Sequence, residues 1–499
     1  MLLAAMIVLA ASASAARKMA TITPASGPLE TGVGFFGLST DAENATQFQR
    51  IRAAGAKYVQ IRMYWRTIAP AGATPPTGFA PANPADPNYN WNSYDQQITE
   101  AVAAGLKPIV AITSAPRWAE GSLSGSDDTG SYKPSPSELA KFMTAVGQRY
   151  SGSFEGLPQV RYWAVWNEPN YNTFLSPQRV GKKLFSPDWY RSMLNAAADS
   201  LHAVSSSNIV IGGETGPFGV ASTAQSTANI MPITFMEKVL CISEKSSRNK
   251  KTKAVTIQYK SACKTKTRFD VWSHHPYTQG GPAMKAKAHG NASLGDMGAM
   301  RAVLNAATKA GHISSRQKVR LWVTEFSWDS KPPDPKAVPI ALETRWVAQM
   351  LHNMWSSGVS FVNWFMLRDE PLSSSLWQSG LYYGGANISS DRAKPILQAF
   401  RFPFVATPKI VKKKTTVQLW GRTPTGSSGS VVIERKSGSS WKRVKTLSAN
   451  RYGIFNASIP KPANTSILRA RLANGSDQSA AFSLTEPKKQ WTGCVWGLC

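Results

Sequence analysis

The sequence has few cysteines, few acidic side chains and no long apolar run beyond its first residues. Only four cysteines occur in 499 residues, which excludes a small scaffold built on disulfides. Apart from the adjacent His274 and His275, cysteine and histidine do not occur at the spacing typical of a zinc site. We therefore expect no metal and no organic cofactor. After residue 16 no apolar stretch is long enough to cross a bilayer, so no transmembrane segment is expected in the mature chain.

Acidic residues are scarce relative to basic ones. There are 57 Lys and Arg against 29 Asp and Glu, giving a formal charge of +28, which favours polyanionic partners. Nine basic residues and one Glu lie at 241–268, and sixteen basic and three acidic residues lie at 404–499. We expect this surface to adhere to an acidic cell-envelope or extracellular polymer. Nucleic acid is a weaker alternative, because no nucleic-acid-binding module is recognisable.

Residues 1–16, MLLAAMIVLAASASAA, read as a secretory signal peptide cleaved near 13–16. The interpretation predicts a secreted or cell-envelope-associated protein. No Lys or Arg precedes the apolar run, which leaves open a start further upstream or a chain that is not exported. The cysteines form two close pairs, Cys241 with Cys263 and Cys494 with Cys499, and both pairs are predicted to be disulfides.

Between about residues 30 and 403 the chain alternates short β-branched or aromatic runs with longer segments of helical period. That alternation is typical of βα units around a parallel sheet. Eight such runs can be counted, at 32–40, 57–65, 107–116, 160–170, 209–217, 269–277, 319–328 and 359–367. Eight is the number of strands in a TIM (β/α)₈ barrel. The sequence therefore predicts an α/β barrel as the main domain.

Two departures from this pattern suggest further parts. The fifth unit carries a basic insert at about 241–268, predicted to be a hairpin held at its base by Cys241 and Cys263. After residue 403, short alternating strands are expected at 415–422, 429–438, 441–448, 453–460, 466–473 and 480–485. Short strands with regular turns predict a small β-sandwich of immunoglobulin or fibronectin type at 404–487. A cysteine-containing tail follows at 488–499.

Two glutamates lie at predicted strand ends, Glu168 in WNEPN after the fourth strand and Glu325 in WVTEF on the seventh. In a barrel, the carboxyl ends of the strands carry the active site. Retaining hydrolysis of a glycoside needs two carboxyl groups about 5–5.5 Å apart, whereas inversion needs roughly 6.5–9.5 Å. Either glutamate alone is often a solvated loop acid, but the pair on these strands predicts a glycoside hydrolase.

With Asn167, this pair resembles the site of the clan A glycoside hydrolases, in family 39-like or family 5-like enzymes. The resemblance covers about residues 32–402. It implies retaining cleavage of an O-glycosidic bond in an oligo- or polysaccharide, with Glu168 as acid/base and Glu325 as nucleophile. It also implies that Asn167 binds the sugar 2-hydroxyl.

The resemblance extends to other strand ends. Arg62 resembles the arginine that keeps the nucleophile ionised, and His275 and Tyr277 in SHHPY match a His-x-Tyr motif. Of the two adjacent histidines, His275 fits that motif's register. Trp364 resembles a tryptophan that forms the floor of a sugar subsite. Further sugar-stacking candidates, with ordinary packing as the alternative, are Trp118, Trp65, Trp328 and Trp377.

A second hypothesis is a noncatalytic carbohydrate- or envelope-binding protein on the same barrel. The sequence also leaves open the sugar, the linkage, exo or endo action, and transfer to another sugar in place of water. Loop shape determines these properties, and loops are the part that a single sequence predicts least.

Overall fold

The computed structural model describes residues 27–487, except 38–39, 123–129, 222, 224, 249–254, 374, 376, 412–413 and 464–465, and also Trp491. The predicted signal peptide and the Cys494–Cys499 pair lie outside the described residues. In the part of the chain that is described, no helix is long and apolar enough to span a membrane.

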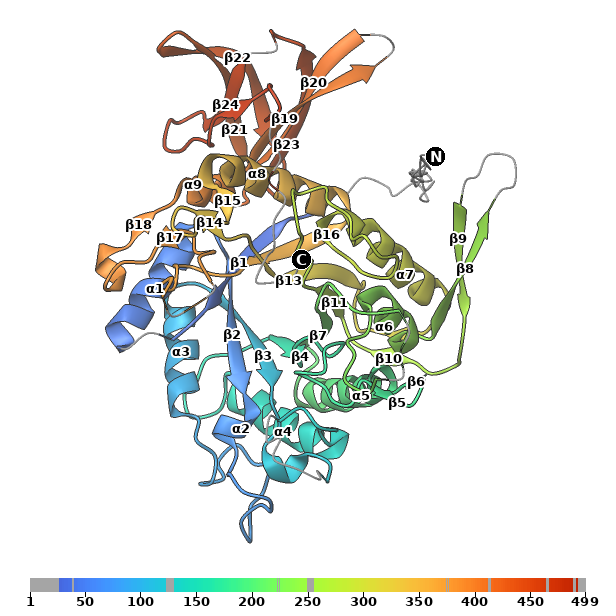
Figure 1. Ribbon diagram of the computed structural model, residues 1–499. Helices are drawn as coiled ribbons and strands as arrows, with labels where there is room; N and C mark the ends of the chain where they lie inside the picture. The colour runs from blue at the N-terminus through green and yellow to red at the C-terminus, as the bar shows by residue number, and fades with distance from the viewer. Residues whose placement is uncertain are drawn as a thin grey trace, which may run out of the picture.

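Eight parallel strands close into a barrel (Figure 1). In chain order they are β1 (Glu30–Phe35), β2 (Tyr58–Tyr64), β3 (Lys107–Thr113), β4 (Tyr162–Val165), β7 (Ile209–Thr215), β11 (Val271–His274), β13 (Arg320–Phe326) and β16 (Val359–Trp364). Seven lie within predicted runs, and β1 overlaps the run at 32–40 but begins two residues earlier. Strand β1 pairs with both β2 and β16 to close the sheet. The predicted TIM barrel is confirmed.

Helices surround the barrel and connect successive strands (Figure 1). The longer ones are α1 (Asp41–Ala53), α3 (Asn92–Ala103), α4 (Pro136–Arg149), α5 (Ser186–Val204), α6 (Pro232–Val239), α7 (Met297–Lys309) and α8 (Ile340–Ser356), with the shorter α2 (Trp65–Ile68) and α9 (Pro395–Arg401). Local sequence fixes several ends. The Ser135 side chain caps α4, where Pro136 occupies the first turn.

An aromatic layer fills the barrel interior below the strand ends. Tyr58, Tyr162, Trp322 and Phe361 contact one another with ring centroids 4.6–6.1 Å apart. Side chains alternate between the two faces of a strand. Arg62 lies four residues after Tyr58 on β2, so it points into the barrel as Tyr58 does. The packed layer leaves the carboxyl ends of the strands as the place for a site.

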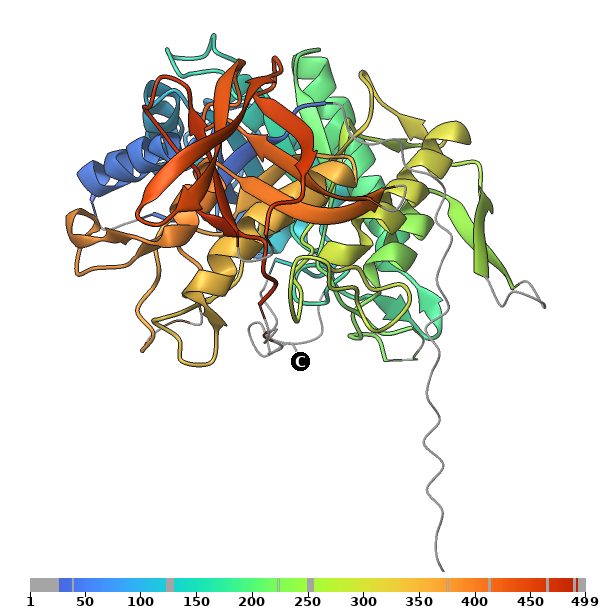
Figure 2. The same ribbon diagram turned by 90° about the horizontal axis from the view of Figure 1, so that it is seen from above.

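The basic insert forms a hairpin, β8 (Ile242–Arg248) and β9 (Val255–Ser261), which projects from the barrel in both views (Figures 1 and 2). Cys241 and Cys263 are joined in a disulfide at its base, with their Cα atoms 5.0 Å apart. The predicted Cys241–Cys263 bridge is therefore confirmed. The outer face of the hairpin carries Lys245 and Lys260, which register pairing places on one side of the ribbon.

The C-terminal part forms two antiparallel sheets. One has the order β19-β20-β23, with β19 (Phe404–Val411), β20 (Lys414–Arg422) and β23 (Ile454–Pro460). The other has the order β22-β21-β24-β25, with β21 (Gly429–Ser437), β22 (Ser440–Ala449), β24 (Ile467–Leu472) and β25 (Phe482–Ser483). Strand β19 was not expected from the sequence. It contains Pro408, and proline is tolerated in an edge strand because only one side of such a strand pairs with a neighbour in the sheet.

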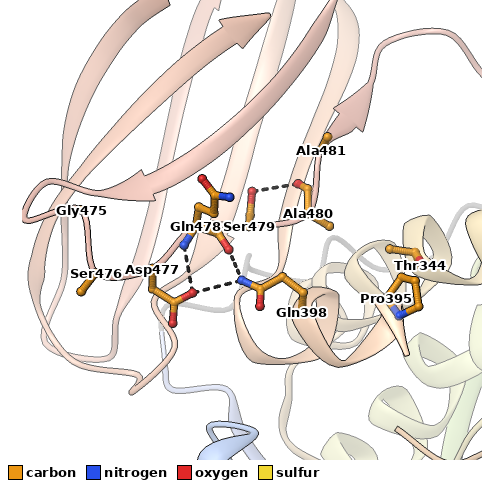
Figure 3. Close-up of a pocket in the computed structure, with 10 residues that line it drawn as sticks. All are labelled: Thr344, Pro395, Gln398, Gly475, Ser476, Asp477, Gln478, Ser479, Ala480 and Ala481. Carbon is orange, nitrogen blue, oxygen red and sulfur yellow. Dashed lines mark hydrogen bonds between the residues drawn. The ribbon is translucent and has the colours of Figure 1, made fainter. Parts of the chain in front are cut away.

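The two sheets contact the barrel along α8 and α9 (Figure 1). The ring of Trp420 on β20 lies 4.9 Å from that of His352 and 5.8 Å from that of Trp355, both on α8. An open hollow of about 720 Å³ marks part of this junction, where the 475–481 turn faces α9 (Figure 3). There Asp477 accepts hydrogen bonds from Gln398 at 3.0 Å and from Arg401 at 2.8 Å. Apolar and ionic contacts thus fix the sheets to the outside of the barrel.

Candidate active site

The two predicted glutamates lie at the same end of the barrel. Glu325 is the penultimate residue of β13, and Glu168 follows the end of β4 by three residues. The backbone at Glu168 has φ +37°, in the left-handed region, and β13 shifts register against β16 between Val323 and Phe326. Such irregularities change the direction of side chains at strand ends. Both carboxylates are largely buried, with side-chain exposures of 13% and 11%.

Arg62 and Tyr277 hold the Glu325 carboxylate. An Arg62 guanidinium nitrogen lies 2.8 Å from Glu325 Oε2, and the Tyr277 hydroxyl donates to Oε1 at 2.8 Å. Burial and the nearby Glu325 charge raise the pKa of Tyr277 well above its usual range, so Tyr277 stays a hydrogen-bond donor. The Glu325 carboxylate thus has a cation at one oxygen and a hydrogen-bond donor at the other.

His275 lies between the two glutamates and is completely buried. Its Nδ1 is 3.1 Å from Glu168 Oε1 and 3.9 Å from Glu325 Oε2. Burial lowers the pKa of His275, but Glu325, Glu168 and Glu214 outweigh that effect and raise it to about 10. His274 points elsewhere and bonds Thr215, and burial lowers its pKa to about 3. His275 therefore belongs to the cluster formed with Glu168, Glu325 and Glu214. His274 is neutral and has a structural role.

Glu168 Oε1 and Glu325 Oε2 lie 3.1 and 3.9 Å from the same nitrogen, so these two oxygens are at most 7.0 Å apart. This limit includes the separation of about 5–5.5 Å that retention needs and excludes most of the range of roughly 6.5–9.5 Å for inversion. Burial raises the pKa of Glu168 above its usual range. Glu325 raises it further, while His275 and Arg62 oppose the rise. Acid-assisted displacement needs two carboxyl groups in different protonation states. A raised pKa lets Glu168 keep its proton and so serve as the acid beside Glu325.

Sequence reasoning missed a third glutamate. Glu214 is the penultimate residue of the fifth barrel strand β7 and is completely buried. Its Oε2 lies 3.4 Å from His275 Nε2. Its position at a strand end, like those of Glu168 and Glu325, was the available signal. Gly216 was also missed. A Cβ there would lie 2.9 Å from Glu168 Oε1, so only glycine leaves that carboxylate in place.

The remaining predicted residues lie in different surroundings. Asn167 is 5% exposed, and its side chain makes no hydrogen bond with another described residue. Trp364 is 0% exposed and donates its indole N–H to the Ser379 carbonyl at 2.8 Å. The predicted sugar-stacking role of Trp364 is wrong for this geometry, because a ring with no exposed face cannot contact a sugar. Trp118 is half-buried, edge-on to Trp65, and its role stays a prediction.

Other aromatic rings lie at the rim beside Glu325. Phe365 follows β16, and its backbone N–H bonds the carbonyl of Phe326, the residue after Glu325. Its ring lies 5.0 Å from Phe36, beyond β1, and 5.5 Å from Trp377. Phe36 and Trp377 are half-buried. Of this group only Trp377 had been considered from the sequence.

A family model described as Cellulase (glycosyl hydrolase family 5) matches residues 27–369. The chain belongs to glycosyl hydrolase family 5. Family 5 membership makes the protein a glycosidase with a carbohydrate substrate. It also resolves the choice between family 5-like and family 39-like that the motifs left open.

Similar solved structures include three family 39 enzymes, of which the first shares the fold of this family 5 protein. A family 39 glycoside hydrolase from the gut symbiont Bacteroides cellulosilyticus WH2 has 14% identity and a TM-score of 0.50, over 87% of this chain and 79% of that chain. The family 39 enzyme from Xanthomonas axonopodis pv. citri has 14% identity and a TM-score of 0.48, over 88% and 93%. A family 39 β-xylosidase from Caulobacter crescentus has 15% identity and a TM-score of 0.46, over 82% and 84%. No curated protein matches the chain.

Among the described residues, no group of three or more His, Cys, Asp or Glu side chains is arranged to hold a metal ion.

Proposed function

We propose that this family 5 glycosidase cleaves O-glycosidic bonds with retention, through a covalent glycosyl-enzyme intermediate. The observation that carries the proposal is the contact of both Glu168 and Glu325 with one nitrogen of His275. In the first step a Glu325 oxygen attacks the anomeric carbon, and Glu168 gives its proton to the leaving oxygen as the bond to the anomeric carbon breaks. Glu325, paired with Arg62 and Tyr277, is the ionised partner.

The second step reverses the roles. Once Glu325 is an ester it has lost the negative charge that raises the pKa of Glu168. Glu168 then ionises more readily and takes a proton from water as that water attacks the anomeric carbon and releases Glu325. A second sugar in place of water gives transglycosylation from the same intermediate.

Substrate binding is assigned to side chains at the rim. The Asn167 amide is available for the sugar 2-hydroxyl, a contact that strengthens in the transition state. Phe36 and Trp377, grouped around Phe365, offer partly open rings for the apolar face of a sugar. We assign the stacking surface to these rings in place of Trp364.

The anomeric configuration of the first product tests the mechanism. The protein is screened against a glycan library, and the product of an active substrate is followed by ¹H NMR before mutarotation. We expect the product anomer to match that of the substrate. An inverted first product would overturn retention, and binding without turnover of any substrate would favour the noncatalytic alternative.

We further infer that the protein is secreted and that the two C-terminal sheets form a β-sandwich serving as an adhesion module for an acidic polymer. Buried apolar residues from both sheets belong to one core cluster, including Val417, Leu419, Val431, Ile433 and Leu468. The end of the β21–β22 hairpin exposes five cations, Arg435, Lys436, Lys442, Arg443 and Lys445.

Retention on immobilised polygalacturonate tests the adhesion surface. We expect binding to weaken steeply as NaCl rises, because released counterions drive such contacts. Replacing Lys442, Arg443 and Lys445 with Ala is expected to weaken it further at a given salt concentration. The matched control replaces Lys245 and Lys260 with Ala on the β8–β9 hairpin. A larger effect of the control variant would place the surface on the hairpin, contrary to the proposal.

A further inference from the structure

Glu214 is hydrogen-bonded to the strand that carries Glu325 and to the backbone of Glu168. Its Oε1 accepts a hydrogen bond from the Thr324 hydroxyl at 2.7 Å and another from Ser273 Oγ. Thr324 directly precedes Glu325. The Glu214 carbonyl accepts the backbone N–H of Glu168 at 2.8 Å. Glu214 is completely buried, and both of these side-chain hydrogen bonds go to Oε1. Its other oxygen, Oε2, faces His275.

The imidazole of His275 has a carboxylate oxygen at each nitrogen. Nε2 lies 3.4 Å from Glu214 Oε2, and Nδ1 lies 3.1 Å from Glu168 Oε1. A neutral imidazole has one N–H and can donate to only one of them. A doubly protonated ring donates to both, and each ionised neighbour stabilises its charge.

We propose that Glu214 is a positioning residue that keeps His275 an imidazolium and so directs the transferable proton of Glu168 to Oε2. This inference rests on the proposed acid/base role of Glu168. When Nδ1–H donates to Glu168 Oε1, that oxygen acts as an acceptor, and the carboxylic proton sits on the other oxygen. Oε2 makes no hydrogen bond with another described residue, so its proton is available to the leaving oxygen of a substrate.

The charges around the cluster are consistent with this assignment. With Glu168 protonated, the positive Arg62 and His275 balance the negative Glu325 and Glu214. When Glu325 becomes an ester and Glu168 ionises, the two positive and two negative charges remain equal in number. A buried site of low dielectric favours such a constant balance. Among the described residues, the titratable groups that interact with His275 or Glu214 include Glu168, Glu325, His274 and Tyr190. Arg62 and Tyr277 act on the same cluster through Glu325 and Glu168.

Nitrogen NMR of the histidine side chains tests the charge of His275 without any need for activity. The chain has six histidines, and the signal of His275 is identified by its loss in His275→Asn. We expect both ring nitrogens of ¹⁵N-labelled wild-type protein to be protonated at pH 7. In Glu214→Gln we expect the ring to lose its proton at least about one pH unit lower. A neutral His275 in the wild type, or the same titration in both proteins, would overturn the proposal.

Kinetics test the consequence for proton transfer. We expect Glu214→Gln to lower kcat/KM about 10- to 100-fold for a glycoside whose leaving group needs protonation. For a dinitrophenyl glycoside, which needs no proton, we expect a much smaller loss. An equal loss on both substrates would show a merely structural role. Ser273→Ala is the matched control, because it removes the hydrogen bonds of Ser273 Oγ to Glu214 Oε1 and from the Glu214 backbone N–H but keeps the Glu214 charge. Its activity is expected to fall between those of the two proteins.

Two results keep the outcomes separate. If circular dichroism shows that Glu214→Gln does not fold, the same measurements are made on Glu214→Asp, which retains the charge. His275 is expected to stay doubly protonated in that variant. A neutral His275 in that variant would contradict the proposal. If the wild type cleaves no glycoside but its His275 is charged and depends on Glu214, the proposed function fails while the charge assignment stands.

Discussion

Replacing Glu325 with Gln is expected to lower kcat on an aryl glycoside by at least about 10⁴-fold. The amide keeps the size of the side chain and can still accept from Tyr277, but it cannot attack the anomeric carbon. It also leaves the Arg62 guanidinium, 2.8 Å away, without its ion pair. The measurement is steady-state hydrolysis of the best substrate from the glycan screen.

The matched control for this variant is Glu138→Gln, on the outer helix α4. Its side chain is 26% exposed and pairs only with neighbouring surface groups, so we expect activity close to that of the wild type. Activity of Glu325→Gln within tenfold of the wild type would rule out Glu325 as nucleophile.

Replacing Glu168 with Ala is expected to separate the two chemical steps. For substrates with poor leaving groups, loss of the acid should lower kcat/KM about 10²- to 10⁴-fold. For a dinitrophenyl glycoside the first step needs no acid, so the intermediate should form and then hydrolyse slowly for lack of a base. Added azide needs no base, and we expect it to restore turnover and give a glycosyl azide of retained configuration.

The same variant tests the pH dependence. Burial raises the pKa of Glu168, so the protonated, active form persists to higher pH than an exposed glutamate would allow. Wild-type kcat/KM should fall as pH rises through that raised pKa, and Glu168→Ala should lack this alkaline limb. Exposed Glu155→Ala is the control and should keep it. A limb that survives in Glu168→Ala would assign it to another group.

Much of the barrel could be predicted because its signal is local. Buried parallel strands leave short apolar runs, and each of the eight predicted runs overlaps a barrel strand. Residues at the ends of parallel strands converge, so Arg62, Glu168, His275, Tyr277 and Glu325 could be expected to meet. Strand β19 was missed because Pro408 reads as a break, and only its edge position in the sheet makes proline tolerable there.

Two features of the site depended on tertiary structure and could not be predicted. Trp364 matched a motif, but its burial depends on the chain around Ser379, which covers the indole and accepts its N–H. The charge of His275 depends on three carboxylates from three different strand ends. One of them, Glu214, belongs to no motif quoted from the sequence, so its importance emerges only from its contacts.

Helix α8 has neighbours on two sides, the barrel strands and the C-terminal sheets. Its residues Trp346, Met350 and Leu351 are buried, and Trp355 on the same helix faces Trp420 of β20. In a chain shortened to end before β19, the face of α8 that carries Trp355 would be exposed to water. An exposed apolar face of this kind favours self-association. We therefore expect the glycosidase barrel to depend on the C-terminal sheets to keep this face of α8 covered.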